Sequence, residues 1–146
     1  MITVTLIVGV AVSLAILEFA GVVAGAIIAP GYVALLLDQP AALLAVAAAV
    51  VATHIVVSLL APWLMLYGTR RLSVSILVGL VFATGIAAMR GELMSELLVW
   101  AGLGYVVPGL IAHQWYRQGA LPTFLALAVA APLTRVISIA VAGVLP

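Results

Sequence analysis

Two of the few ionisable residues in this chain recur in the same pattern. Glu18 is followed twelve residues later by Pro30-Gly31, and Glu96 is followed twelve residues later by Pro108-Gly109. Proline and glycine interrupt helices, and a carboxylate inside an apolar segment is unfavourable in lipid unless protein or water surrounds it. Paired interrupted segments are typical of a site at a repeat interface. We therefore expect both glutamates to face the interior and to hold the broken segments; the alternative is a solvated position at the end of a span.

Arg135 is a third candidate for this interior site. It lies fifteen residues into the last apolar segment, too deep for an ordinary loop residue. Because a guanidinium group keeps its proton, the side chain must snorkel to an interface or face protein or water. We predict that Arg135 contacts Glu18 or Glu96.

A second set of polar residues lies near the ends of apolar segments: Arg70, Arg71, His113, Arg117 and Gln118. The last three of these share one stripe with Gln114 if their segment is helical. The alternatives are a solvated helix end and a surface that docks a partner or binds an anion.

Two other polar positions have structural explanations. His54 lies within an apolar segment, where a hydrogen bond across helices is expected. The sequence Asp38-Gln39-Pro40 is typical of a helix start, with Pro40 in the first turn. Aromatic residues near segment ends, Trp115 and Tyr116 among them, are expected to form an interfacial belt.

The composition defines the class of protein. Apolar residues make up 68% of the 146 residues, charged residues make up 6%, and the mean hydropathy is +1.47. A soluble domain carries about a quarter charged residues. We therefore predict an all-α integral membrane protein with a single multispanning domain over 1–146. Residues 1–17 lack the positively charged start of a signal peptide and are expected to form the first span.

Polar residues divide the chain into six apolar segments: 2–17, 19–37, 41–66, 72–89, 97–112 and 121–145. An offset of 78 residues relates the first three to the last three, with repeat units 1–71 and 72–146 and with segments two and five broken at Pro-Gly. Three crossings in each unit predict an inverted repeat, whereas broken segments that only dip into the bilayer predict a parallel one. The arginine distribution places the loops at 67–71 and 113–118 in the cytoplasm and both termini outside.

The chain lacks the residues that several kinds of catalysis require. The chain has no lysine, which removes a Walker A lysine, a Ser-Lys dyad and a Schiff base. It has no cysteine, and its two histidines are far apart in the sequence, so a metal site is not expected. We predict no catalytic residue, no cofactor and no nucleic-acid partner for this chain.

A set of short motifs carries a resemblance to a known family. The motifs are Pro30-Gly31-Tyr32, Gln39-Pro40, Tyr67-Gly68-Thr69-Arg70-Arg71, Val106-Val107-Pro108-Gly109-Leu110-Ile111-Ala112 and Gln118-Gly119. In length and motif order the whole chain resembles the CapC/PgsC family, the membrane subunit of bacterial poly-γ-glutamate synthase. It departs from the expected pattern at Asp38 and His113, where asparagine is expected, which leaves any role of those two side chains open.

The resemblance implies an activity that depends on partners. An ATP-dependent amide ligase, CapB, would hold the ATP and extend the polymer, and CapA would be a further subunit on the outer face. This chain would anchor the ligase in the bacterial cell membrane and help to pass the polyanion outward, with Arg70, Arg71 and Arg117 in contact with CapB or the polymer. Two alternatives stay open: an oligomeric conduit for the polymer, and a small secondary transporter using Glu18, Glu96 and Arg135.

Overall fold

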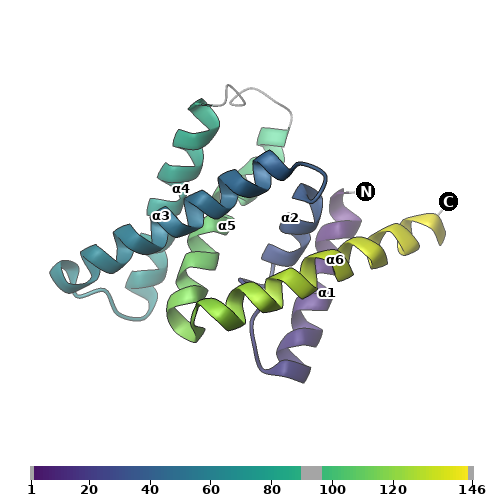
Figure 1. Ribbon diagram of the computed structural model, residues 1–146, viewed down its shortest axis with the longest axis horizontal. Helices are drawn as coiled ribbons and strands as arrows, with labels where there is room; N and C mark the ends of the chain where they lie inside the picture. The colour runs from purple at the N-terminus through teal and green to yellow at the C-terminus, as the bar shows by residue number, and fades with distance from the viewer. Residues whose placement is uncertain (1, 90–96, 145–146) are drawn as a thin grey trace. The chain divides into compact units, whose positions relative to one another are not determined.

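The computed structural model describes residues 2–89 and 97–144, and the regular structure of these residues is helical throughout (Figure 1). Six helices occur in these ranges: α1 (Ile2–Ala20), α2 (Ala29–Leu36), α3 (Pro40–Leu64), α4 (Thr69–Met89), α5 (Leu97–Gln118) and α6 (Ala120–Val144). The bounds of α1, α3, α4 and α6 agree with the predicted segments to within three residues. The predicted all-helical class is confirmed, and Pro40 is the first residue of α3 as expected.

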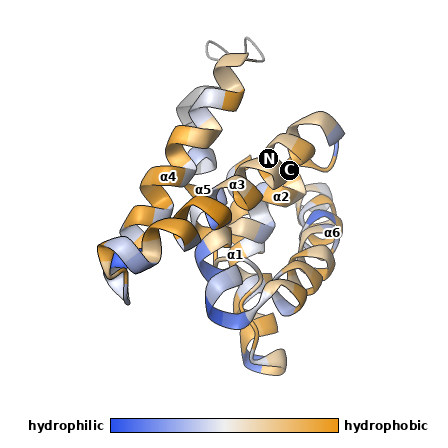
Figure 2. Cartoon of the chain, turned by 60° about the vertical axis from the view of Figure 1, so that its left-hand side comes forward, coloured by the Kyte–Doolittle hydropathy of each residue, from blue (hydrophilic) through white to orange (hydrophobic). Residues whose placement is uncertain are grey.

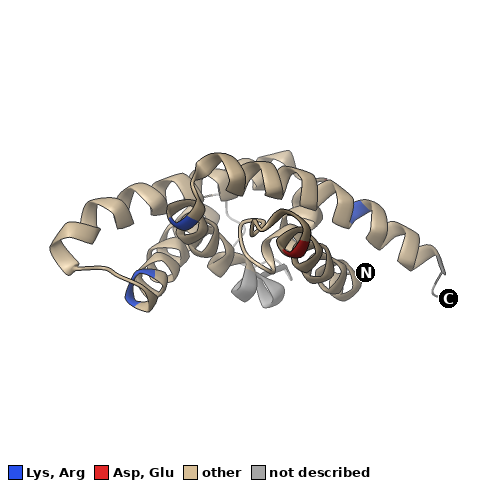
Figure 3. Cartoon of the chain, turned by 90° about the horizontal axis from the view of Figure 1, so that it is seen from below, with Lys and Arg blue, Asp and Glu red and all other residues tan. Residues whose placement is uncertain are grey.

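Four of the helices in the described ranges are long and apolar enough to cross a membrane: α1, α3, α4 and α6 as far as Gly143. Hydrophobic colouring covers most of their length (Figure 2), and residues coloured as charged are sparse along the described chain (Figure 3). Large apolar side chains stay exposed, including Phe19 at 93% and Met89 at 90%. So much exposed apolar surface suits a hydrocarbon environment better than water.

The Pro-Gly pairs do not interrupt helices in the way that the sequence suggests. In segment two, residues 21–28 form no helix, and Pro30 lies in the first turn of α2, where its missing N–H is not needed. In segment five, α5 runs through Pro108 and on to Gln118, so the predicted break and the predicted loop at 113–118 are both wrong. Proline inside a helix removes one hydrogen bond, and a helix packed against other protein segments can tolerate that loss.

Contacts along the chain define two compact units. Unit 1 comprises Met1–Leu43 and Arg117–Pro146, and unit 2 comprises Leu44–Tyr116. In unit 1, helices α1, α2 and α6 pack against one another. Val12, Ala24 and Ala130 form the centre of their core, with Val8, Ile16, Ala126 and Ile137 packed around it. Neither unit is one of the sequential repeat units 1–71 and 72–146, and the inverted orientation of the repeat stays a prediction.

The same glycine contact occurs inside each unit. In unit 1, a Cβ placed on Gly9 of α1 would lie 2.5 Å from the backbone N of Gly31 in α2. In unit 2, a Cβ on Gly79 of α4 would lie 2.6 Å from the backbone N of Gly109 in α5. These glycines are 22 residues apart in the first half and 30 in the second, so α1 and α4 correspond at an offset of 70 rather than 78. Each Pro-Gly pair therefore lets two helix backbones touch.

The third helix of each predicted half also has a matched buried face. On α3 the face consists of Ala49, Val50 and Thr53. On α6 it consists of Ala130, Ala131 and Thr134, in the same order and spacing. Both threonines are fully buried, and neither hydroxyl has a hydrogen-bond partner. The two faces are related by an offset of 81 residues and not by the predicted 78, so the repeat relation of segments three and six stays a prediction.

Candidate functional site

A buried arginine is the main polar feature of unit 2. Arg71 lies in the first turn of α4 and is only 5% exposed. Its guanidinium carbon lies 3.4 Å from the centroid of the Tyr116 ring on α5, and its Nη2 is 3.5 Å from the hydroxyl oxygen of Ser58 on α3. Helices α3, α4 and α5 therefore all contribute to the surroundings of this cation. The neighbouring Arg70 is exposed.

His54 lies in the same unit and makes the contact across helices that the sequence predicts. Its Nδ1 is 3.5 Å from the carbonyl oxygen of Ala112 on α5. Its ring stacks on Trp115, with centroids 4.1 Å apart and planes 6° from parallel. Trp115 thus holds His54 of α3 against the end of α5, and Tyr116 holds Arg71 of α4 there. These contacts are additional to any role of the two residues in an aromatic belt.

Arg135 forms an ion pair in unit 1, but its partner differs from the predicted one. The guanidinium Nη2 donates to the carboxylate of Asp38, and Nη1 donates to the carbonyl oxygen of Ala34 at 3.3 Å. The predicted contact with Glu18 is wrong, because Glu18 is exposed in the last turn of α1; Glu96 lies outside the described residues. Asp38 lies two residues after α2, so the pair fastens the end of that helix to α6.

A double-mutant cycle tests this pairing. Asp38→Asn and Arg135→Gln are expected to couple by about 0.5–1 kcal/mol, a small value because Asp38 is 66% exposed and solvent screens the pair. Thermal unfolding in detergent measures the coupling, which should shrink as salt is added. The same cycle with Glu18→Gln is the control and should give no coupling. A larger coupling to Glu18 than to Asp38 would contradict the structure.

Gln118 clamps an irregular loop of unit 1. Its Oε1 accepts a hydrogen bond from the backbone N–H of Val23 at 3.1 Å, and its Nε2 donates to the carbonyl oxygen of Val23 and to Thr123. Thr123 is fully buried and donates in turn to the carbonyl of Gly119. Gly119 has φ +93° and is the single residue between α5 and α6. These bonds occupy the Gln118 amide, which the sequence had indicated as a partner contact.

The structure places the other predicted site residues in three ways. Pro30, Gly31, Pro108 and Gly109 are buried in helix contacts, and Arg70 and Arg117 are exposed. His113 is partly buried. The described residues contain no cluster of three or more histidine and acidic side chains that could hold a metal ion.

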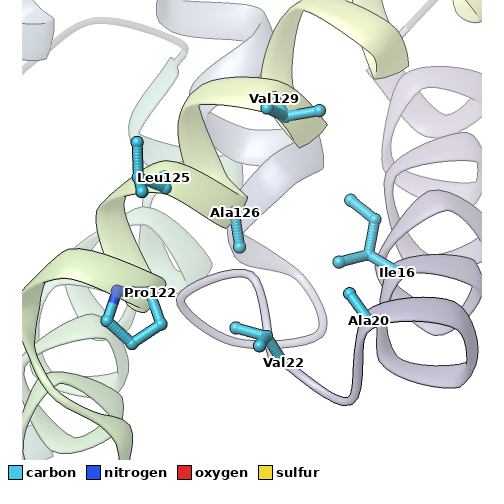
Figure 4. Close-up of a pocket in the computed structure, with 7 residues that line it drawn as sticks. All are labelled: Ile16, Ala20, Val22, Pro122, Leu125, Ala126 and Val129. Carbon is cyan, nitrogen blue, oxygen red and sulfur yellow. The ribbon is translucent and has the colours of Figure 1, made fainter.

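A cavity of about 340 Å³ lies in unit 1 and has an apolar lining (Figure 4). Ile16 and Ala20 of α1, Val22 of the loop that follows, and four residues of α6 form its wall: Pro122, Leu125, Ala126 and Val129. None of these side chains offers a polar group that could orient a substrate. The polar side-chain contacts described above involve His54, Arg71, Gln118 and Arg135, and none of these residues lines this cavity.

Comparison with known proteins decides the family. The model of the family described as "Capsule biosynthesis CapC" matches residues 8–124. This chain belongs to the CapC family. The match includes Arg71, Tyr116 and Gln118, and it ends before Arg135.

Two curated CapC proteins are similar to this chain over most of their lengths. The PGA biosynthesis protein CapC of Bacillus subtilis (strain 168) is 32% identical over 122 residues, which cover 83% of this chain and 82% of the relative. The capsule biosynthesis protein CapC of Bacillus anthracis is 30% identical over 117 residues, which cover 80% of this chain and 78% of the relative. No solved structure gives a significant match. The resemblance to CapC inferred from short motifs is therefore confirmed.

Two residues of these sites were not predicted from the sequence. Tyr116 was assigned to an interfacial belt, although an arginine near the start of a helix needs a partner that stabilises its charge. Asp38 was explained as part of a helix start, although an acid next to a hydrophobic segment is also a natural partner for an arginine within another segment. In both cases the available signal was an arginine whose charge needs a stabilising partner.

Proposed function

We propose that this CapC-family protein is a non-catalytic, multi-pass subunit of a poly-γ-glutamate synthase in the bacterial cell membrane. It holds an ATP-dependent CapB-type ligase at the membrane, works with a CapA-type subunit, and helps the growing polymer to pass outward. The family match over residues 8–124 is the observation that carries this proposal. The four apolar helices support a membrane location.

The names of the two relatives support the polymer as the product of the assembly. One relative is called a PGA biosynthesis protein and the other a capsule biosynthesis protein. The composition of this chain supports a division of labour, since without lysine it cannot use a Walker A motif to bind ATP. The nucleotide and the chemistry of amide formation then belong to the ligase.

Arg70 and Arg117 are the residues that we assign to ligase docking. Both are exposed, and exposed arginines act on a protein partner through electrostatic attraction and through hydrogen bonds to its carboxylates. The secondary-transporter alternative used Glu18, Glu96 and Arg135; Arg135 pairs with Asp38 instead of Glu18, and Glu96 lies outside the described residues.

Co-purification tests the docking assignment. An Arg70→Ala/Arg117→Ala variant is expected to recover roughly tenfold less CapB-type ligase than the unchanged protein, since two exposed ion pairs are worth up to about 1 kcal/mol each. Polymer synthesis in the same membranes should fall with the ligase. The Arg70→Lys/Arg117→Lys variant keeps both charges and is the matched control. Full ligase recovery with the double alanine variant would remove the assignment.

A further inference from the structure

Arg71 is a buried charge, and no acidic residue in the described part of unit 2 neutralises it. Between residues 44 and 116 the acidic residues of the sequence are Glu92 and Glu96, so the described part of unit 2 contains no carboxylate. The Nε atom of Arg71 is buried without any hydrogen-bond partner, and the contact from Nη2 to Ser58 is long at 3.5 Å. Arg71 also lies in the first turn of α4, where the helix dipole disfavours a positive charge.

The compensation that is present is too small for a cation of this burial. A cation–π contact such as the one with Tyr116 contributes about 0.5–2 kcal/mol. Removing a guanidinium ion from water has an effective penalty of several kcal/mol, even after the protein relaxes. Arg135 shows the contrast within the same chain, since it is 32% exposed and still has Asp38 as its partner.

We propose that Arg71 is the centre of a carboxylate-binding site, and that its ligand is a carboxylate of the γ-linked glutamate chain. This inference rests on the proposed function and assigns to Arg71 a role different from ligase docking. A carboxylate supplies the charge and the acceptor atoms that the site lacks. Because Arg71 is buried and Arg70 is exposed, a flexible polymer reaches Arg71 more readily than an acid on the folded surface of a ligase does.

The geometry fits a planar anion with two oxygens. Nε and Nη2 form one edge of the guanidinium fork, and this edge is the part of the group that is poorly satisfied. A carboxylate can accept from both atoms, and the Ser58 hydroxyl next to Nη2 can donate a further hydrogen bond to it. Nε is buried, so binding requires side chains next to Arg71 to move aside; Tyr116, which lies against the guanidinium group, is 52% exposed.

A site with one cation also suits a polymer that must be released again. Transport of an anion requires binding that is favourable enough for entry and weak enough for departure. One guanidinium and one hydroxyl hold a single carboxylate and leave the others of the chain in solvent. The site is then a transient contact for successive glutamate units.

Binding of a short γ-linked glutamate oligomer tests this proposal. The full-length protein is placed in nanodiscs of phosphatidylcholine without ligase, and the dissociation constant of a fluorescent oligomer is measured. Arg71→Gln should weaken binding roughly tenfold or more, and Arg71→Lys should give an intermediate loss because it keeps the charge but not the fork. Arg70→Gln removes the same charge from the neighbouring position and should leave oligomer binding within about twofold. Unchanged binding by Arg71→Gln overturns the proposal.

A stability measurement separates ligand binding from a structural role. Without oligomer, the thermal midpoint of Arg71→Gln should equal or exceed that of the unchanged protein, because a poorly compensated buried charge has been removed. The oligomer should raise the midpoint of the unchanged protein and not that of Arg71→Gln. A large fall in the midpoint of Arg71→Gln without oligomer would mean that Arg71 supports the fold, and the proposal would be wrong.

Two further arms identify the ligand and separate this proposal from the proposed function. If inorganic phosphate or phosphatidylglycerol displaces the oligomer at lower concentration than glutamate does, the site binds phosphate groups and the assignment to the polymer fails. If Arg71→Gln no longer recovers the ligase, Arg71 is a docking residue and the assignment fails as well. If the unchanged protein recovers no ligase but binds the oligomer through Arg71, the anchoring function fails and the carboxylate site stands.

Discussion

Gly79→Ala is expected to prevent the close packing of α4 against α5. The added Cβ would lie 2.6 Å from the backbone N and 2.7 Å from the Cα of Gly109, and neither atom can move without shifting a whole helix. Overpacking of a core typically destabilises a protein by 1–3 kcal/mol, and a clash between two backbones belongs at or above the upper end of that range, about 3 kcal/mol. The yield of monodisperse protein in detergent and its thermal midpoint measure the effect.

Gly85→Ala is the matched control for this prediction. Gly85 lies on the same helix, and a Cβ at that position would meet no heavy atom within 4 Å. Alanine there should leave the protein unchanged or stabilise it by up to about 1 kcal/mol, through its higher helix propensity. Equal stability of the two variants would show that α4 and α5 do not touch at Gly79. Gly9→Ala in α1 should behave like Gly79→Ala, since Gly31 approaches it in the same way.

Gln118→Glu is expected to release the loop at residues 21–28 from the end of α5. The substitution keeps the size of the side chain, but a carboxylate cannot donate to the Val23 carbonyl and places a negative charge beside that oxygen. Leaving a sheltered polar group without its partner costs about 1–3 kcal/mol, and the repulsion adds to this loss. Hydrogen exchange at the Val23 amide should accelerate, and the thermal midpoint of the protein should fall.

A second glutamine supplies the control for Gln118→Glu. Gln39 is exposed immediately before α3, so Gln39→Glu makes the same chemical change where water can solvate the new charge. It should leave both the thermal midpoint and exchange at Val23 unchanged. If Gln118→Glu had no more effect than Gln39→Glu, the amide clamp would be unimportant for the stability of the loop.

Most of the helical framework could be predicted because apolar length alone defines it. Segments 2–17, 41–66, 72–89 and 121–145 became α1, α3, α4 and α6 with small changes at their ends. The course of the chain around the Pro-Gly pairs could not be predicted in the same way. Proline is tolerated both in the first turn of a helix and, with packing around it, inside one, so Pro30 and Pro108 have different local structures in spite of their matching sequence.

The polar contacts were harder to predict because their partners are remote in the sequence. Arg135 and Asp38 are 97 residues apart, and Gln118 and Val23 are 95 residues apart. No local spacing encodes such pairs. The difference between Arg70 and Arg71 was also hidden, since adjacent residues of a helix point in different directions and the sequence does not reveal which one is buried. By contrast, the contact of His54 with a neighbouring helix could be predicted, because this residue lies within an apolar segment.

Unit 1 joins the beginning of the chain to its end, and this has a consequence for biosynthesis. A ribosome delivers α1, the loop at 21–28 and α2 long before it delivers Gln118 and Arg135, which satisfy Val23 and Asp38. The amino-terminal helices must therefore wait with open polar groups until residues 118 and 135 have been made. A chain truncated before residue 117 leaves those groups permanently without these partners.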